Sequence, residues 1–231
     1  MEKYQQGKIS EEKTRVIVVP GEVIASGESY LPGDNTKRED KDIIANKFGL
    51  AEKEGRLVKV IPLAEKYMPR KGNVVIGKII DVTFSGWIVD INSCYSAFLS
   101  VKECAKFLNK NNLIEYLDFG DMIIAEVLEV RHRAVDLTLK ARGLGKIENG
   151  IIIKINSSKV PRVIGRGGSM VNMIKHESEC RITVGQNGIA WIKGEKLENE
   201  LLAKEAIMLI ATKPFVEGLT EKIKKFLESK K

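Results

Sequence analysis

The sequence has few of the side chains from which catalytic and metal sites are built. It contains three cysteines, Cys94, Cys104 and Cys180, without a CxxC spacing, and two histidines, His132 and His176. The acidic residues are scattered as EE, ED and E-x-E over polar stretches, which is consistent with solvated faces and not with a catalytic cluster. Metal-assisted hydrolysis and nucleophilic catalysis need such clusters. We therefore expect no catalysis by this chain alone, no metal and no cofactor, and we expect the cysteines to be buried thiols.

Long apolar runs are also missing. No stretch reaches the about 20 apolar residues that a membrane-spanning helix needs. The first residues, MEKYQQGKISEEK, are polar and lack the pattern of a signal peptide. We therefore expect an intracellular, cytoplasmic protein without a membrane segment.

The chain does have considerable length and an unevenly distributed positive charge. Its 231 residues are enough for two or three domains, each with its own core. The net charge of +7 is divided as +1 for residues 1–70, 0 for 71–143 and +6 for 144–231. Such an excess favours a polyanionic partner for the last third. Part of this excess lies in the KIKKF and SKK segments, for which a solvated helix face is the alternative.

The most informative stretch is VIGRGG at residues 163–168. Gly165, Gly167 and Gly168 lack a Cβ, so the backbone can adopt conformations that let a sugar-phosphate chain approach closely. Arg166 lies between them to meet a phosphate. An apolar helical pattern follows, so the loop precedes a helix N-terminus, which favours anions. A glycine-rich segment by itself, however, is more often a plain turn.

The surroundings of this loop favour a nucleic-acid-binding unit. Runs typical of β-strands occupy residues 151–158, 180–184 and 189–194, the last two joined by the turn VGQNG, and an apolar helical pattern covers 197–210. This order resembles a KH domain. The residues that match the family pattern are Val163, Ile164, Gly165, Gly168, Val171 and Ile174, with Val171 where the family has isoleucine.

The KH resemblance implies an α+β domain of type I whose glycine loop holds about four nucleotides of single-stranded RNA over an apolar floor. The implied basic rim consists of Arg162, Arg166, Lys175 and Arg181. The implied floor consists of Val163, Ile164, Met170 and Ile182. For aliphatic residues the alternative is simple core packing, which we favour for Val171 and Ile174. Ile164 and Ile182 are evenly balanced between core and groove.

The middle third predicts a small β-barrel. Strand-like runs at residues 74–82, 86–91 and 96–100 are followed, after the polar segment 109–112, by DMIIAEVLEVRH and AVDLTLKARG. Five strands with a short helical insert describe an OB-fold. KG…IGKI, the Gly120-Asp121 step and VDLTLK resemble the OB-fold RNA-binding domain named after ribosomal protein S-one. Ser100 stands where that family often has histidine, and the aromatic residues of FSGW are displaced from its usual platform.

Barrels of this family bind RNA through a basic groove with aromatic side chains on which bases stack. The implied stacking residues are Phe84, Trp87 and Tyr95, and the implied basic surface consists of Arg131, His132, Arg133, Lys140 and Arg142. Burial in the small core is the favoured alternative for a lone tryptophan. An ordinary charged hairpin tip is the alternative for the RHR cluster.

The first 66 residues predict a small β-rich domain of nearly neutral charge, which we expect to dock onto another protein. The whole chain is thus expected to be multidomain, with a β-rich docking domain at 1–66, a five-stranded OB-fold barrel at 67–143, and a KH domain with an extra C-terminal helix at 144–231.

The order of these units resembles the RNA-binding cap subunits of the archaeal exosome. Y-x-P-x-x-G-x-x-V-I-G-K-I at residues 67–79, the early VVPGE, a single KH domain after the barrel and the closing TKPFVEGLTEKIKKFLE carry the resemblance. It implies a non-catalytic subunit, three copies of which, alone or mixed with another cap subunit, sit on a hexameric ring of ribonuclease-PH-like proteins. They bind RNA, with a preference for adenine-rich sequences, and feed its 3′ end into the ring. The alternative is a free-standing RNA-binding regulator of transcription or translation.

Overall fold

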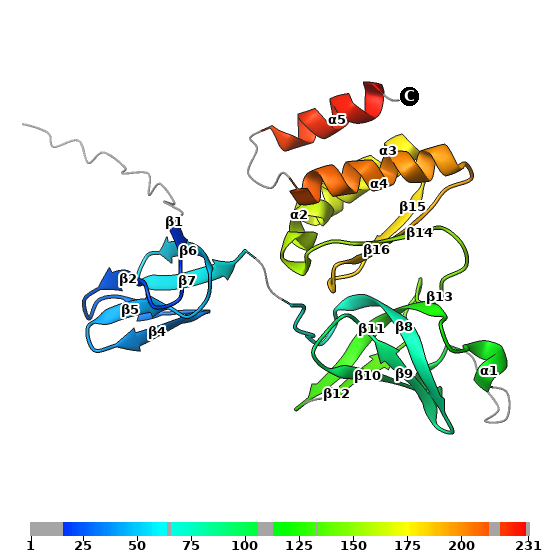
Figure 1. Cartoon of the computed structure of the whole chain (residues 1–231), viewed down its shortest axis with the longest axis horizontal. Helices are drawn as coiled ribbons and strands as arrows, with labels where there is room; N and C mark the ends of the chain where they lie inside the picture. Colours follow the sequence, from blue (N-terminus) through cyan, green and yellow to red (C-terminus); the bar gives the residue numbers. More distant parts are fainter. Residues whose placement is uncertain (1–15, 64–65, 106–112, 133, 213–217, 230–231) are drawn as a thin grey trace, which may run out of the picture. The chain divides into compact units, whose positions relative to one another are not determined.

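A computed structural model describes residues 16–63, 66–105, 113–132, 134–212 and 218–229 (Figure 1). The chain divides into two compact units, Met1–Ala64 and Glu65–Lys231. In the described residues no helix is both long and apolar enough to cross a membrane. The predicted multidomain architecture, with a β-rich region, a barrel and an α+β domain, is confirmed. The domain boundaries at 66 and 143 stay predictions.

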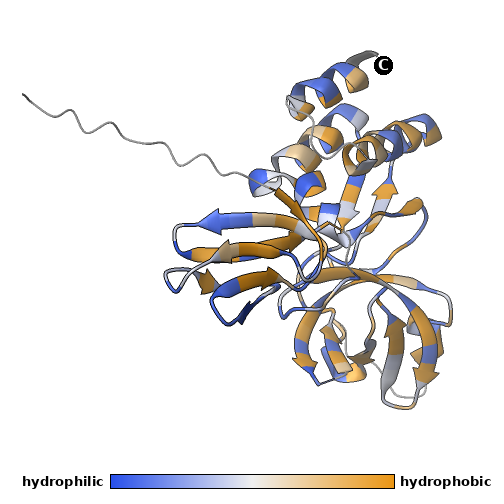
Figure 2. Cartoon of the chain, turned by 60° about the vertical axis from the view of Figure 1, so that its left-hand side comes forward, coloured by the Kyte–Doolittle hydropathy of each residue, from blue (hydrophilic) through white to orange (hydrophobic). Residues whose placement is uncertain are grey.

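The first unit consists of two small β-sheets. One has the order β1-β6-β7-β3 and the other β2-β5-β4. The strands are β1 (Val16–Val18), β2 (Val23–Ser26), β3 (Leu31–Pro32), β4 (Thr36–Glu39), β5 (Asp42–Ala45), β6 (Gly49–Glu54) and β7 (Leu57–Pro62). Val18, Ala45 and Val60 meet in a core to which both sheets contribute. The strand β1 is apolar, as the colouring of Figure 2 shows, and its Val16 and Ile17 are exposed.

The second unit begins with a closed barrel of five strands. They are β8 (Val74–Thr83), β9 (Gly86–Asp90), β10 (Ser96–Ser100), β11 (Met122–Arg131) and β12 (Ala134–Thr138). The barrel runs β12-β10-β9-β8-β11 and closes through the pairing of β11 with β12. The short helix α1 (Leu113–Tyr116) lies between the third and fourth strands, as predicted. Alternating side chains of every strand fill the interior.

An α+β domain follows the barrel. Its elements are β14 (Ile151–Lys154), α2 (Val160–Ile164), α3 (Ser169–Ser178), β15 (Arg181–Val184), β16 (Ile189–Lys193) and α4 (Leu197–Thr212), with α5 (Leu219–Ser229) as the extra C-terminal helix. The antiparallel sheet has the order β14-β16-β15. The helices α2, α3 and α4 pack against one face of this sheet, around Val163, Ile174 and Ile192, and α5 packs on α3 and α4 (Figure 1).

The other face of this sheet packs against the barrel. Ile76 of β8, Ile124 of β11 and Ile189 of β16 form a shared apolar cluster, against which Trp191 also packs. The turn Gly185–Gly188, which the sequence predicted only as a hairpin turn, connects β15 to β16 and contacts the barrel. The barrel and the α+β domain therefore share one continuous core contact, which we call the seam.

The seam also contains a buried amide. Asn187 is 0% exposed, and its Nδ2 donates hydrogen bonds to the carbonyl oxygens of Ile76, at 2.7 Å, and Ile91, at 2.9 Å. Its Oδ1 accepts from the backbone N–H of Ile76 at 3.3 Å. The neighbouring Gln186 N–H donates to the carbonyl of Val74 at 2.9 Å. Because buried polar groups need partners, these bonds fix the turn on the edge of the barrel.

Candidate nucleic-acid interface

The glycine loop connects α2 to α3 and has the backbone geometry that only glycine adopts easily. Gly165, Gly167 and Gly168 have φ angles of 76°, 60° and 81°. A Cβ on Gly165 would lie 2.8 Å from the backbone nitrogen of Met170, whereas a Cβ on Gly167 would meet nothing within 4 Å. Gly165 is therefore required by packing, and the backbone at Gly167 is open to an approaching ligand.

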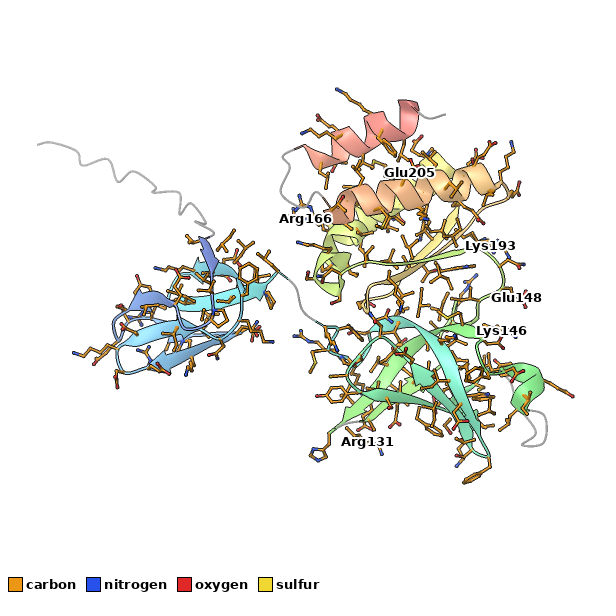
Figure 3. The ribbon with its side chains drawn as sticks, in the orientation of Figure 1. Arg131, Lys146, Glu148, Arg166, Lys193 and Glu205 are labelled. Carbon is orange, nitrogen blue, oxygen red and sulfur yellow. The ribbon has the colours of Figure 1, made fainter. Side chains whose placement is uncertain are left out.

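Arg166 is exposed at the tip of this loop, where Figure 3 shows its side chain. It precedes the N-terminal end of α3, whose first N–H groups attract anions. The loop thus combines an accessible backbone, a positive charge and a helix dipole. These are the elements that hold a phosphate.

A small apolar groove lies beside the glycine loop. It encloses about 340 Å³ and is lined by Ser157, Val160, Pro161, Ile164, Gly165 and Gln186. Of the predicted floor residues, only Ile164 lies here. Val163, Met170 and Ile182 are buried in the core and do not line this groove. Val160 was missed, although its i, i+4 spacing to Ile164 places both on one face of α2.

The predicted basic rim is divided between two places. Arg166 is at the loop and Arg162 is half-buried on α2, whereas Lys175 and Arg181 line a second groove of about 500 Å³ between the α+β domain and the barrel. We call this second groove the seam groove. It is also lined by Ile182 and Trp191 and by Gly143, Leu144, Gly145 and Lys146. Lys146 and Trp191 were not predicted, because the sequence gives no sign that the barrel and the α+β domain meet at these residues.

The charge of Lys146 is partly balanced. Its Nζ lies 2.5 Å from a carboxylate oxygen of Asp121. Burial opposes ionisation of Asp121, but the hydrogen bonds from Lys146 and from the Asp118 N–H outweigh it and lower the pKa of this carboxyl group. Figure 3 shows Lys146 on the same side of the unit as Lys193, whose Nζ donates to the carbonyl of Glu148. Lys175 and Arg181 therefore carry the positive potential of the seam groove.

The three predicted stacking residues of the barrel have different environments. Phe84 lies at the turn between β8 and β9 and is 84% exposed. Trp87 is fully buried, its Nε1 donating to the carbonyl of Leu117 at 2.8 Å and its ring 5.9 Å from that of Tyr116. Trp87 is therefore a core residue, because no base can reach its ring. Tyr95 is half-buried and packs against the same core.

A further aromatic residue on the barrel was missed. Phe98 lies on β10 opposite Ile88 on β9, and both are half-buried on the outer face. The alternation of SAFLS could have indicated it, because Ala97 and Leu99 point into the core. Phe98 and Ile88 thus form a half-buried apolar pair on the outer face of the barrel.

Two of the predicted basic residues of the barrel, Arg131 and Lys140, have nearby acidic partners. Arg131, at the tip of the β11–β12 hairpin in Figure 3, contacts Glu129 at 2.6 Å and Asp136 at 3.4 Å, which raises the pKa of its guanidinium. Lys140 lies 2.9 Å from Glu103, and its hydrogen bond lowers the pKa of this carboxyl group. His132 and Arg142 are exposed, and Arg133 lies outside the described residues. The ion pairs therefore reduce the free positive charge of Arg131 and Lys140.

The cysteines were predicted to be buried thiols. This is confirmed for Cys104 and Cys180, but it is wrong for Cys94, which is exposed in the loop between β9 and β10. Burial raises the pKa of the Cys104 thiol to about 11, so it is protonated near neutral pH and a poor nucleophile. Among the described residues, no group of three or more His, Cys, Asp and Glu side chains could hold a metal ion.

Comparisons with known proteins agree with this architecture. A family model described as "KH domain" matches residues 150–209, and one described as "RRP4, S1 domain" matches residues 66–129. Exosome complex component Rrp4 of Methanothermus fervidus is 44% identical over 216 residues, covering 93% of this chain and 96% of that protein. Exosome complex component Rrp4 of Pyrococcus furiosus is 44% identical over 224 residues, covering 94% and 84%.

A solved structure is similar as well. The crystal structure of a protein described as an exosome complex RNA-binding protein is 39% identical, with a TM-score of 0.66, and the match covers 72% of this chain and 97% of that one. The order of a β-rich unit, an S1 barrel and a single KH domain is thus supported by sequence and by fold. This chain belongs to the Rrp4 family of exosome components.

Proposed function

We propose that this protein is a non-catalytic RNA-binding cap subunit of a cytoplasmic exosome. It binds single-stranded RNA, with a preference for adenine-rich sequences, and feeds it to a hexameric ring of ribonuclease-PH-like subunits for 3′ to 5′ degradation. Three copies, alone or with another cap subunit, complete each ring. The observation that carries this proposal is the open glycine loop with Arg166 beside an apolar groove, in one compact unit with an S1 barrel.

The RNA-binding part of the proposal rests on two grooves. The groove at the glycine loop offers a positive tip and an apolar wall, which suit a phosphate and a base. The seam groove adds Lys175 and Arg181, and the barrel adds the exposed ring of Phe84. Stacking and charge together bind single strands without requiring one sequence.

The seam groove leads to a test of charge. Replacing Lys175 and Arg181 by alanine should reduce the salt dependence of RNA binding, because two fewer counterions are released. The slope of log K against log salt should become shallower by about 1.4, at about 0.7 per phosphate contact on a single strand. The same pair of substitutions at Lys222 and Lys225, both exposed on α5, is the matched control and should leave the slope unchanged. Equal slopes for both variants would remove the seam groove from the RNA-binding surface.

The docking part of the proposal rests on an exposed apolar row in the first unit. Ile17 pairs with Leu50, and Leu50 pairs with Ile61, so the three side chains lie across β1, β6 and β7 on one face. Ile17 is 60% exposed and Ile61 is 40% exposed. Contiguous exposed apolar surface marks sites of protein association. This row favours a subunit of an assembly over the alternative of a free-standing RNA-binding regulator.

Aspartate at both Ile17 and Ile61 should abolish co-purification with the ribonuclease-PH-like ring. A charge placed in an apolar contact loses its hydration without gaining a partner, which prevents association. The RNA affinity of the isolated variant, measured by fluorescence anisotropy, should stay within about twofold of the wild type. The reason is that the proposed RNA-binding surface lies in the second unit.

The control for this experiment changes more charge without touching the apolar row. Lys41→Asp with Arg56→Asp alters two exposed turn residues of the same unit and should still bind the ring. If the Ile17 and Ile61 variant also binds the ring, docking by this face is excluded. If the Ile17 and Ile61 variant loses RNA binding instead, the first unit contacts RNA. The assignment of docking to the first unit and RNA binding to the second is then wrong.

A further inference from the structure

The outer face of α4 carries a row of exposed apolar side chains. Leu197 is 65% exposed, Leu201 44% and Met208 38%. They occupy positions i, i+4 and i+11, so the three side chains follow one another along the same side of the helix. The opposite side, with Ile207 and Ile210, is buried in the core of the domain. The row therefore lies outside the core, and contiguous exposed apolar surface marks sites of association with other molecules.

This row borders a groove of about 630 Å³ between the end of α3 and the first half of α4. Leu201 and Leu202 are the apolar residues of its lining. Four carboxylates and one ammonium group give the lining a net charge of −3. These charged residues are Glu177, Glu179, Lys196, Glu198 and Glu205, the last of which is shown in Figure 3. The groove thus combines apolar and acidic side chains.

The negative charge of this groove contrasts with its surroundings, because residues 144–231 together carry +6. The carbonyl end of α3 adds the negative pole of a helix dipole. The glycine loop lies at the other end of α3, which is ten residues or about 15 Å long. Figure 3 accordingly shows Arg166 of the loop and Glu205 of the groove at separate places. One end of α3 therefore attracts phosphates, and the other attracts cations.

We propose that the groove and the apolar row of α4 bind a basic, amphipathic segment of a partner protein. The apolar side chains of this segment pack on Leu197 and Leu201, and its lysine or arginine side chains pair with the carboxylates. Charge complementarity selects this occupant, since the carboxylates repel both the phosphates of RNA and an anionic membrane surface. The glycine loop stays accessible, so the KH domain can hold a protein and RNA at opposite ends of α3.

Binding of the full chain to two fluorescein-labelled helical peptides tests this inference. One peptide consists of leucine and lysine in an amphipathic pattern, and the other has glutamate in place of every lysine. The whole chain has a net charge of +7, so long-range attraction alone favours the glutamate peptide. We expect fluorescence anisotropy to show the opposite order, with the lysine peptide bound about tenfold more tightly.

Variants locate the binding site. Lysine at both Glu179 and Glu198 should weaken binding of the lysine peptide by about tenfold, because attraction becomes repulsion. Lysine at Glu148 and Glu221 is the matched control: both residues are exposed, one in a loop and one in the first turn of a helix, and the loss should stay below about twofold. Leu201→Ser removes apolar contact without changing charge and should weaken binding by about threefold.

Thermal unfolding shows whether each variant is folded. Equal losses in the two charge-reversal variants would reduce the effect to net charge and overturn the inference. A wild type that binds the lysine peptide no more tightly than the glutamate peptide would overturn it too. A loss of RNA affinity in the variant at Glu179 and Glu198 would assign the groove to nucleic acid instead. The peptide assay contains no RNA, so its outcome does not depend on the proposed function.

Discussion

Alanine in place of Asn187 should lower the free energy of unfolding of the chain by about 3 kcal/mol, at roughly 1 kcal/mol for each hydrogen bond lost. The side chain makes three hydrogen bonds to the backbone of Ile76 and Ile91 and is fully buried. Alanine leaves a cavity and deprives buried backbone groups of partners, so both effects act in the same direction. Urea denaturation followed by circular dichroism measures the change.

A control variant and a local fluorescence signal can show that the loss of stability caused by Asn187→Ala arises at the seam. Asn172→Ala, at an exposed site on α3, is the matched control and should change stability by less than about 0.5 kcal/mol. With the seam weakened, the fluorescence of Trp191, which packs in it, should change before the overall transition. An Asn187→Ala variant as stable as the control would mean that the seam is held by its apolar cluster alone.

The second large effect is expected at the glycine loop. Aspartate at both Arg166 and Gly167 should weaken binding to single-stranded RNA by roughly 30-fold at moderate salt, about 2 kcal/mol, because one cation becomes two anions facing a phosphate chain. The fold should survive. Arg166 is exposed, space around Gly167 is open, and aspartate tolerates the left-handed backbone conformation better than most residues. Anisotropy titrations and a thermal melt measure the two properties.

Gly167→Asn separates charge from shape at this site. Asparagine adopts the same backbone conformation without charge, so any loss of affinity it causes reflects reduced access to the backbone. We expect it to weaken RNA binding by only about threefold, since phosphate attraction through Arg166 is retained. If the doubly acidic variant binds RNA as tightly as the wild type, the loop is a packing element and the barrel alone contacts RNA.

Features set by neighbouring residues could be predicted from the sequence. The glycine loop, the helix after it and the alternating strands of the barrel depend on local periods and on backbone freedom, which the sequence shows directly. The burial of Trp87 was the favoured alternative in the sequence, because a small barrel needs a large ring in its core, and the structure agrees. The exposure of Phe84 follows from its place in a tight turn.

Features that depend on distant contacts could not be predicted. Asn187 contacts Ile76, 111 residues earlier, so its turn looked like any hairpin turn in the sequence. The sequence indicated Lys175 and Arg181 as part of a KH rim. It could not show that the barrel provides the other wall of the groove that they line. The exposure of Cys94 likewise depends on how the loop before β10 is packed.

The buried amide of Asn187 has a consequence for how RNA length is sensed. Since the KH groove and the barrel are fastened together, a strand held at one of them is presented to the other at a high effective concentration, with no flexible linker to dilute it. On the proposed function, short oligonucleotides should reach only one of the two surfaces and dissociate quickly. Strands that span both gain avidity in one step, so affinity should rise abruptly at a threshold length set by the protein itself.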